Sequence, residues 1–230
     1  MLVLAAGASA RPTHGPIEPL EPGVELEGLA YLPLEVGRTA TFRDGAGNRY
    51  RQIITTPAPL LPADQKIRDR LRRRLVYEMP ASGGTQLIER RILEIDPSRG
   101  VIARPDEAER GGAPPVGKKG VQRRKATAAS AREVELPARL AAHTSWTANG
   151  IEHRVRGLAD VEVEAGSFAR CVVVDAKNAR ELANGESGDM RSFYCPGVGE
   201  VAVLMMVNGA WRPAVELERV TTTDEAGVPP

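Results

Sequence analysis

The 230-residue chain has few aromatic side chains and no excess of charge of either sign. It contains 3 Phe, 2 Trp and 4 Tyr, and its 31 Lys and Arg residues balance 30 Asp and Glu residues. Nucleic-acid binders usually carry a large basic excess, and binders of single strands add aromatic side chains on which bases stack. No apolar run reaches the roughly 18 residues that a membrane-spanning helix requires. The sequence therefore predicts no nucleic-acid partner and no transmembrane span.

Motifs for catalysis, metal binding and cofactor binding are also missing from the sequence. It contains neither the G-x-S-x-G turn of serine hydrolases nor the G-K-[ST] sequence of phosphate-binding loops. The three histidines, His14, His143 and His153, are not spaced with the cysteines as metal ligands would be. We therefore expect no enzyme, no metal and no cofactor, although a catalytic site built from dispersed residues would leave no motif.

Alternation of apolar and polar residues is the main structural signal from about residue 39 onward, and this period is typical of β-strands. Val161 and Val163 alternate with acidic residues, and Val201, Val203 and Met205 recur at every second position. Asp-Gly and Asn-Gly pairs, which favour hairpin turns, separate several of these runs. The pattern predicts an all-β protein, an antiparallel meander that forms a half-barrel, a barrel or a sandwich.

The first 29 residues resemble an export segment followed by a linker. Residues 1–10 are small and apolar, and their Ala8-Ser9-Ala10 sequence is typical of a signal-peptide cleavage site, so we interpret them as a signal-peptide remnant. The alternative is that they pack as a first strand. Residues 11–29 contain four prolines and four glutamates, and proline prevents both helix and ladder hydrogen bonds. We therefore expect residues 11–29 to be an extended, solvated tether.

The tether is expected to lead into a β domain at residues 30–220, made of two similar halves at 30–104 and 132–220. Leu32-Pro33 and Leu136-Pro137 are 104 residues apart, which suggests a weak internal repeat. Residues 105–131 have no aromatic and almost no large apolar side chain, so they predict a flexible loop between the halves. We expect residues 221–230 to form a disordered tail.

The segment 64–79 is basic, and its pattern fits both a helix and a strand. A strand would place four arginines on one face, namely Arg68, Arg70, Arg72 and Arg74. Such a row could contact phosphate, a lipid headgroup or an acidic partner. Alternatively, the arginines pair across the sheet with Glu78, Glu89 or Glu94.

Cys171 and Cys195 are the only cysteines of the chain, and they either form one disulfide or stay as two buried thiols. In an oxidising compartment, closing the loop between them would stabilise the fold by roughly 3 kcal/mol. A separate question is whether the interior holds an apolar ligand. Four large side chains are the candidates to line such a site: Trp146, Met205, Met206 and Trp211.

Three stretches of the chain match the motifs of one protein family. They are residues 31–37 (YLPLEVG), 161–168 (VEVEAGSF) and 193–199 (FYCPGVG). In this order and spacing they resemble a family of uncharacterised bacterial exported proteins and lipoproteins with P-L-x-V-G, V-x-A-G-x-F and Y-x-P-G-V-G motifs. The chain departs from the family at Ala40, where the family prefers Trp. The resemblance implies an all-β envelope domain, an open half-barrel, with no established activity.

These observations lead to three hypotheses about function. The first is a non-catalytic β-domain protein of the bacterial cell envelope, periplasmic or outer-membrane-associated, that acts in binding or structural support. The second is a half-barrel carrier of a lipid or another apolar ligand. The third is an enzyme with a dispersed site. The partner expected under the first two hypotheses is an envelope protein or a lipid.

Overall fold

The computed structural model describes residues 12–57, 72–81, 84–106, 133–148, 150–180 and 187–223. These residues form fifteen β-strands and one short 3-10 helix. The N-terminal elements are β1 (Thr13–His14), β2 (Glu25–Glu27) and the 3-10 helix η1 (Gly28–Tyr31). The next six strands are β3 (Arg38–Asp44), β4 (Arg49–Thr55), β5 (Arg72–Ala81), β6 (Gly84–Asp96), β7 (Gly100–Pro105) and β8 (Glu133–Pro137). The remaining seven are β9 (Arg139–Ala141), β10 (Ser145–Ala148), β11 (Ile151–Val163), β12 (Gly166–Arg180), β13 (Ser187–Cys195), β14 (Gly199–Val207) and β15 (Ala210–Thr222).

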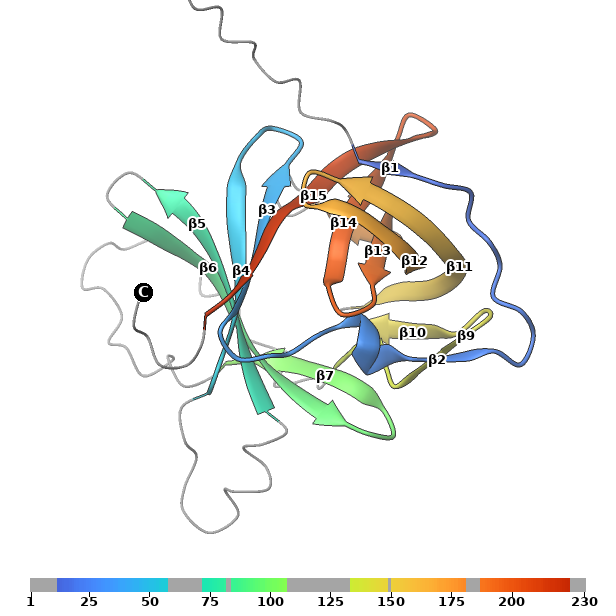
Figure 1. The fold of residues 1–230 in the computed structure, drawn as a ribbon, viewed down its shortest axis with the longest axis horizontal. Helices are drawn as coiled ribbons and strands as arrows, with labels where there is room; N and C mark the ends of the chain where they lie inside the picture. Colours follow the sequence, from blue (N-terminus) through green and yellow to red (C-terminus); the bar gives the residue numbers. More distant parts are fainter. Residues whose placement is uncertain are drawn as a thin grey trace, which may run out of the picture.

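Thirteen of these strands form one antiparallel sheet, in the order β1-β11-β12-β13-β14-β15-β3-β4-β5-β6-β7-β8, with β10 paired to β11 (Figure 1). A second sheet contains only β2 and β9. The predicted all-β antiparallel meander is therefore confirmed. The large sheet curves strongly but does not close into a barrel. Of the three predicted shapes, it is consistent with the half-barrel and the sandwich. Among the described residues, no helix is long and apolar enough to cross a membrane.

The sheet consists of two meanders, β3–β8 and β10–β15, joined by the pairing of the last strand, β15, with β3. The predicted boundary between two halves at residue 132 needs a correction. Residues 133–137 form β8, which pairs with β7, so this strand extends the first meander. The sequence placed it in the second half because the low-complexity stretch before it looked like a linker between halves.

Three hydrophobic clusters hold the sheet together. Along β12, Cys171, Val172, Val173 and Val174 are all at most 2% exposed, so this strand is buried on both faces. Alternate residues of a strand point to opposite faces, and accordingly Cys171 and Val173 belong to one cluster while Val172 and Val174 belong to another. The third cluster lies in the first meander, and its members are Leu34, Ile54, Leu75, Leu93, Val101 and Ala103.

The predicted solvated tether is wrong for its described part, residues 12–27, which we call the N-terminal strap. Its first residues pair with β11, residues Glu18 and Leu158 exchange two backbone hydrogen bonds of 2.8 Å, and β2 pairs with β9. Leu20 is only 6% exposed and packs into the cluster that contains Val172. Proline does lack a donor, but the residues between the prolines supply both donors and apolar side chains.

Three other sequence-based boundaries change or lie outside the described residues. Thr221 and Thr222 belong to β15, and the Thr223 N–H donates to the Gly37 carbonyl, so this start of the predicted tail is part of the sheet. Pro105, at the start of the predicted loop, ends β7. The signal-peptide remnant at 1–10, the loop from 107 onward and the tail from 224 onward lie outside the described residues.

Candidate functional site

The three motif segments, which are far apart in the sequence, come together at one end of β12, β13 and β14. The Gly197 N–H donates to the Ala30 carbonyl over 2.7 Å, and the Arg38 guanidinium donates to the Val198 carbonyl. Gly197 has φ +71°, which explains the need for glycine in this turn. Cys171, three residues after the second motif, forms a disulfide with Cys195 of the third motif, and both residues are fully buried. Of the two states that the sequence left open, the structure contains the disulfide.

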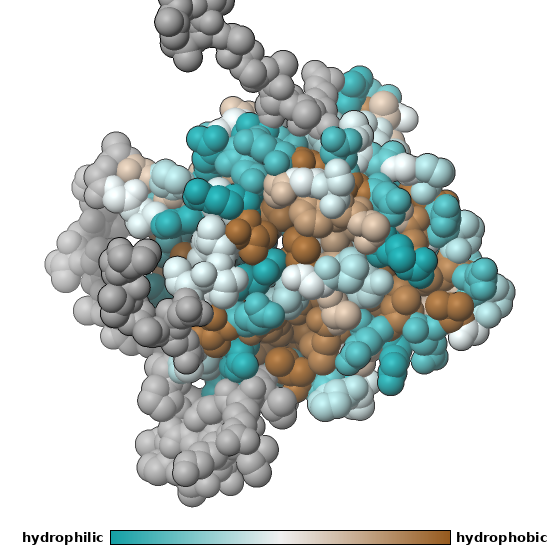
Figure 2. All heavy atoms as spheres, in the orientation of Figure 1, coloured by the Kyte–Doolittle hydropathy of each residue, from teal (hydrophilic) through white to brown (hydrophobic). Residues whose placement is uncertain are grey.

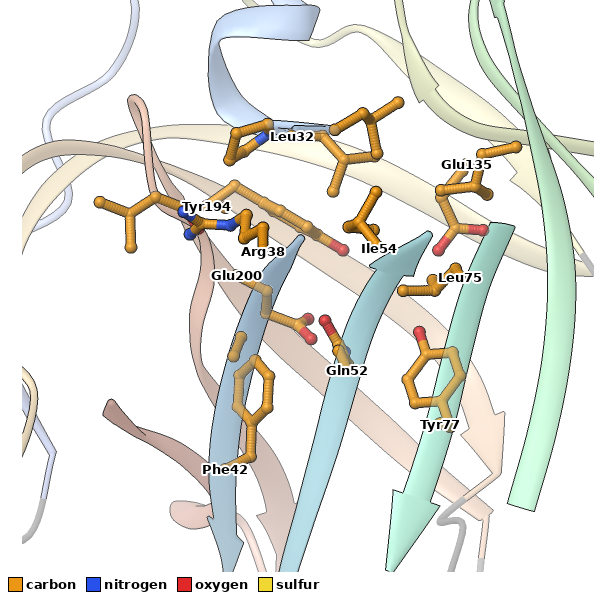
Figure 3. Close-up of a pocket in the computed structure, with 16 residues that line it drawn as sticks. Leu32, Arg38, Phe42, Gln52, Ile54, Leu75, Tyr77, Glu135, Tyr194 and Glu200 are labelled. Atoms are coloured by element: carbon orange, nitrogen blue, oxygen red, sulfur yellow. The ribbon is translucent and has the colours of Figure 1, made fainter. Parts of the chain in front are cut away.

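A cavity of about 60 Å³ lies where the three hydrophobic clusters meet (Figure 3). Its apolar wall includes Leu32 and Ala40 from the first motif segment and the strand that follows it. Besides Arg38 at the start of β3, its polar groups come from five strands and are Gln52 on β4, Tyr77 on β5, Glu135 on β8, Tyr194 on β13 and Glu200 on β14. Figure 3 shows the polar ends of these side chains pointing toward one another.

Burial changes the acid–base properties of the cavity. Loss of hydration raises the pKa of Glu200 to about 7, and the hydrogen bonds that Ser192 and Tyr194 form with this carboxyl oppose the change only in part. Burial also raises the pKa of Glu135, against the pull of the Arg91 charge. The phenol of Tyr194 has its pKa raised well above the ordinary value, for the same reason.

The two carboxyl groups of the cavity, those of Glu135 and Glu200, differ because only Glu135 lies next to Arg91. Arg91 Nη1 lies 3.4 Å from Glu135 Oε2, its Nε lies 2.8 Å from Glu89 Oε1, and its guanidinium lies 5.7 Å from the centre of the Tyr77 ring. Glu135 therefore has a cationic neighbour, whereas the hydrogen-bond partners of Glu200 are hydroxyl groups. Near neutral pH, the Glu200 carboxyl can therefore gain or lose a proton, whereas the Glu135 carboxyl lies beside the positive charge of Arg91.

The size and donor set of the cavity limit what it can hold. A volume of about 60 Å³ accommodates about two water molecules, whereas pockets for small organic ligands measure roughly 300–1,000 Å³. Within the described part of the chain, no group of three or more His, Cys, Asp or Glu residues is placed to hold a metal ion. The cavity therefore suits water or a proton, and not a bulky substrate.

A second concavity, of about 340 Å³, lies beside β1 and is open to solvent. Its walls include His14 from the N-terminal strap, Asp160 and Glu162 from β11, and Phe168 from β12. The Asp160 carboxylate accepts a hydrogen bond from the Arg170 N–H over 2.9 Å, so one of its acidic groups already has a partner. This second concavity is therefore a shallow surface groove and not an enclosed pocket.

The predicted arginine row is described from Arg72 onward, where β5 begins, so the strand interpretation is right for 72–79. Arg74 Nε lies 2.7 Å from Asp106 Oδ2, and Arg72 Nε lies 3.7 Å from Glu94 Oε1. These two arginines thus form ion pairs within the sheet, with Glu94 being one of the partners considered above. Arg68 and Arg70 lie outside the described residues, so an anionic contact there stays a prediction.

The four candidates for an apolar lining do not form one wall. Trp146 stacks on His153 with ring centroids 5.2 Å apart, at β10 and β11. Met206 pairs with Trp211 on β14 and β15, and the Arg191 guanidinium lies 4.3 Å from the Trp211 ring centre. Met205 is buried, and four strands separate β10 from β15 in the sheet. None of the four lines the cavity of Figure 3.

The polar residues of the cavity were not singled out from the sequence, apart from Tyr194, which belongs to the third motif. Glu135 is in phase with Glu133, a polar pattern that normally indicates a solvated face, whereas Gln52 is in the apolar phase of β4 with Ile54 and Tyr77 is in that of β5 with Leu75. A signal was available in the apolar phase of Gln52 and Tyr77, and in Glu200, which directly follows a Pro-Gly-Val-Gly turn. The pairing of strands far apart in the sequence, and not any local pattern, gathers the set.

No protein-family model matches the chain, and no curated protein does. Two solved structures are similar to it. A putative exported protein with a YmcC-like fold from Bacteroides fragilis is 12% identical, with a TM-score of 0.46, over 86% of this chain and 100% of that one. A putative lipoprotein from Parabacteroides distasonis is 13% identical, with a TM-score of 0.42, over 85% of this chain and 99% of that one. Likeness at this level assigns no activity.

Proposed function

We propose that the chain is a non-catalytic β-domain protein of the bacterial cell envelope, which acts in binding or structural support at its surface. The observation that carries this proposal is the filled interior of the curved sheet. Residues of η1 and the first motif, such as Tyr31, Leu32 and Leu34, pack against the sheet and link two of its clusters, leaving a cavity of only about 60 Å³. A protein whose interior is occupied by its own side chains has its outer surface left for partners.

Two features support an exported location for this protein. The sequence Ala8-Ser9-Ala10 is typical of a signal-peptide cleavage site. The disulfide between Cys171 and Cys195 is fully buried, and disulfides persist in oxidising compartments such as the periplasm.

The filled interior argues against the carrier hypothesis. An acyl chain or a comparable apolar ligand needs a continuous apolar space, and the four side chains proposed to line it are distributed from β10 to β15. The cavity that does exist has two carboxyl groups and two phenols among its lining groups, which an apolar ligand would leave without partners.

An enzyme is the second candidate, because one observation favours it. Perturbed titratable groups in a cavity are typical of catalytic sites, and Glu200, with a pKa of about 7, faces Tyr194 and Glu135. Its weakness is the cavity's size of about 60 Å³, well below the roughly 300–1,000 Å³ of pockets for small organic ligands. The same groups serve equally well as a hydrated polar junction between the clusters.

Fractionation and mass spectrometry in the native host test the proposal. We expect the full-length protein in the envelope or periplasmic fraction, with cleavage near Ala10 and neither Cys171 nor Cys195 available for alkylation. Organic extraction of the purified protein should yield no lipid in equimolar amount. A cytoplasmic protein with reduced cysteines would contradict the exported location. One bound lipid per chain would instead support the carrier hypothesis.

NMR titration with pools of small metabolites distinguishes the enzyme hypothesis from the non-catalytic protein. A substrate would shift the ring signals of Tyr77 and Tyr194, and Glu200→Gln would weaken that effect. The matched control is Glu162→Gln, an exposed carboxylate on β11 away from the cavity. Shifts that depend on Glu200 and not on Glu162 would favour an enzyme over the non-catalytic protein.

A further inference from the structure

The end of the β5–β6 hairpin extends beyond the strands on both of its sides. Pairing of β4 with β5 reaches Glu78 opposite Arg51, and pairing of β6 with β7 begins at Arg91 opposite Pro105. Beyond these positions, the strand pairs of the described residues are those of the hairpin with itself. Figure 1 shows this end of β5 and β6 standing apart from the β3–β4 hairpin.

The hairpin end has no charged residue and exposes large apolar side chains. Residues 79–88 (MPASGGTQLI) are uncharged, in a chain of which 27% of the residues are charged. Leu87 is 40% and Ile88 is 51% exposed, and they are two of the three exposed large hydrophobic residues in the described part of the protein. In Figure 2 this end is pale and not the teal of charged residues. Exposed apolar side chains of this kind mark an interaction surface.

The apolar side chains occupy both faces of the hairpin end. Met79 is opposite Gln86, and the next pair along the strands is Glu78 opposite Leu87. Successive pairs in a sheet point to opposite faces, so Met79 and Leu87 lie on different sides of the ribbon. A docked protein would cover one face, whereas a lipid bilayer surrounds an inserted hairpin and meets both.

The charges that border the hairpin end match the polarity of a bilayer surface. Glu78 forms an ion pair with Arg51 at 2.9 Å, and Glu89 forms one with Arg91 at 2.8 Å, directly next to the uncharged segment. Arg51 remains 39% exposed at its side chain. The hairpin thus changes from uncharged to zwitterionic within one residue, as a bilayer does between its hydrocarbon and its headgroups.

We propose that the uncharged end of the β5–β6 hairpin, through its described residues 79–81 and 84–88, inserts into the interfacial region of a lipid bilayer. This inference rests on the proposed function, because an envelope protein meets bilayers on the outer side of the cytoplasmic membrane. The insertion depends on apolar contact, and the paired charges at its border would stay at the level of the headgroups.

Flotation with vesicles of phosphatidylethanolamine and phosphatidylglycerol tests the proposal on the purified full-length protein. We expect the wild type to float with the vesicles, and the Leu87→Glu/Ile88→Glu variant to bind about tenfold more weakly, since carboxylates resist insertion. The matched control is Val207→Glu, at an equally exposed apolar residue on another hairpin, and it should bind within about twofold of wild type. An Ile88→Trp variant should show blue-shifted emission on the vesicles. Thermal melts establish that every variant is folded.

Three outcomes would overturn the inference. They are a wild type that does not float, a loss caused equally by Val207→Glu, and a wild-type dimer that dissociates in the double variant without vesicle binding. The last result would identify a second copy as the occupant. Vesicle binding is measured on the isolated protein, so its failure is distinguishable from a failure of export, which fractionation reports.

Discussion

β12 and β6 are long strands near the middle of their respective meanders, yet their surroundings are opposite. β12 has four consecutive residues, Cys171 to Val174, that are at most 2% exposed. β6 begins with five exposed residues, from Gly84 to Ile88. A strand buried on both faces needs two covering layers, and for β12 one of them includes Leu20 of the N-terminal strap and Tyr31 of η1. The difference shows that cover supplied by distant segments, and not strand length, decides where this sheet is stable.

The largest expected effect is the loss of a side chain that packs beside β12. Phe193 is 1% exposed, pairs with Val173 and belongs to the cluster on one face of that strand. Phe193→Ala should lower the free energy of unfolding by about 3–5 kcal/mol, through lost burial and the cavity left behind. Urea denaturation followed by circular dichroism measures it. Phe193→Leu, the control, should cost less than half as much, and an equal loss in both variants would mean that volume is not the cause.

The next effect tests whether the N-terminal strap is essential cover for the second meander. Gly157 has φ +154°, and a Cβ there would lie 2.2 Å from the Glu18 carbonyl oxygen of the strap. Gly166 has φ +135°, but a Cβ there would meet nothing within 4 Å. Both alanine variants carry backbone strain, so only Gly157→Ala should also displace the strap.

We expect Gly157→Ala to cost about 2 kcal/mol more than Gly166→Ala in the free energy of unfolding. Amide exchange of Glu18 and Leu158, whose N–H groups bond across this contact, should rise by at least about tenfold only in Gly157→Ala. Equal stability and equal exchange in the two variants would show that the strap is dispensable.

Local patterns in the sequence were sufficient to predict the all-β class of this sheet and several of its strands. The hairpin turn at Asn208-Gly209 follows the alternating run from Val201, as the structure has it between β14 and β15. The N-terminal strap was missed because its prolines suggested a solvated chain, and its anchoring depends on Leu20 and on an edge of β11 that only the folded sheet presents. Propensity describes a residue's own backbone and carries no information on which distant edge will accept it.

The candidate site could not be predicted from the sequence, because local patterns do not show which distant segments will come together around a residue. Glu135 is in the polar phase of β8, where side chains are usually solvated, whereas Gln52 and Tyr77 are isolated polar side chains in the apolar phase of β4 and β5. They become buried because the first motif segment packs over them and because β14 brings Glu200 to the same place. Polar residues on a strand are therefore ambiguous until the cover of each face is known.

A smaller effect concerns the pH dependence of stability, which compares the cavity with the surface. The pKa of Glu200 rises from an ordinary value of 4.5 to about 7, so the folded protein holds this proton more tightly than the unfolded chain does. The free energy of unfolding should therefore fall as the pH rises from about 4.5 to about 7, and this contribution changes no further above. A difference of one in pKa corresponds to about 1.4 kcal/mol, and partial exposure of the carboxyl reduces the total to about 1–2 kcal/mol.

The Glu200→Gln variant removes this titration. The free energy of unfolding, obtained from urea denaturation between pH 5 and pH 8, should fall less in Glu200→Gln than in wild type, by about 1–2 kcal/mol. Glu162→Gln, at an exposed position on β11, should keep the wild-type slope. Identical slopes in wild type and Glu200→Gln would mean that the carboxyl is already ionised when buried.

The smallest expected effect on stability is at the exposed end of β6, the strand that was compared with the buried β12. Ile88 is 51% exposed, and the strand pairs of the described hairpin end are internal to the hairpin. Ile88→Ser should change the free energy of unfolding by less than about 0.5 kcal/mol, because the side chain buries little surface and its position is in no core cluster. The measurement is the same urea denaturation that Phe193→Ala requires. A loss above about 1 kcal/mol would show that Ile88 is covered in solution, and the contrast between β6 and β12 would then be one of degree. A neutral result would mean that folding places no demand on isoleucine there, leaving its apolar character to be explained by a contact outside the domain.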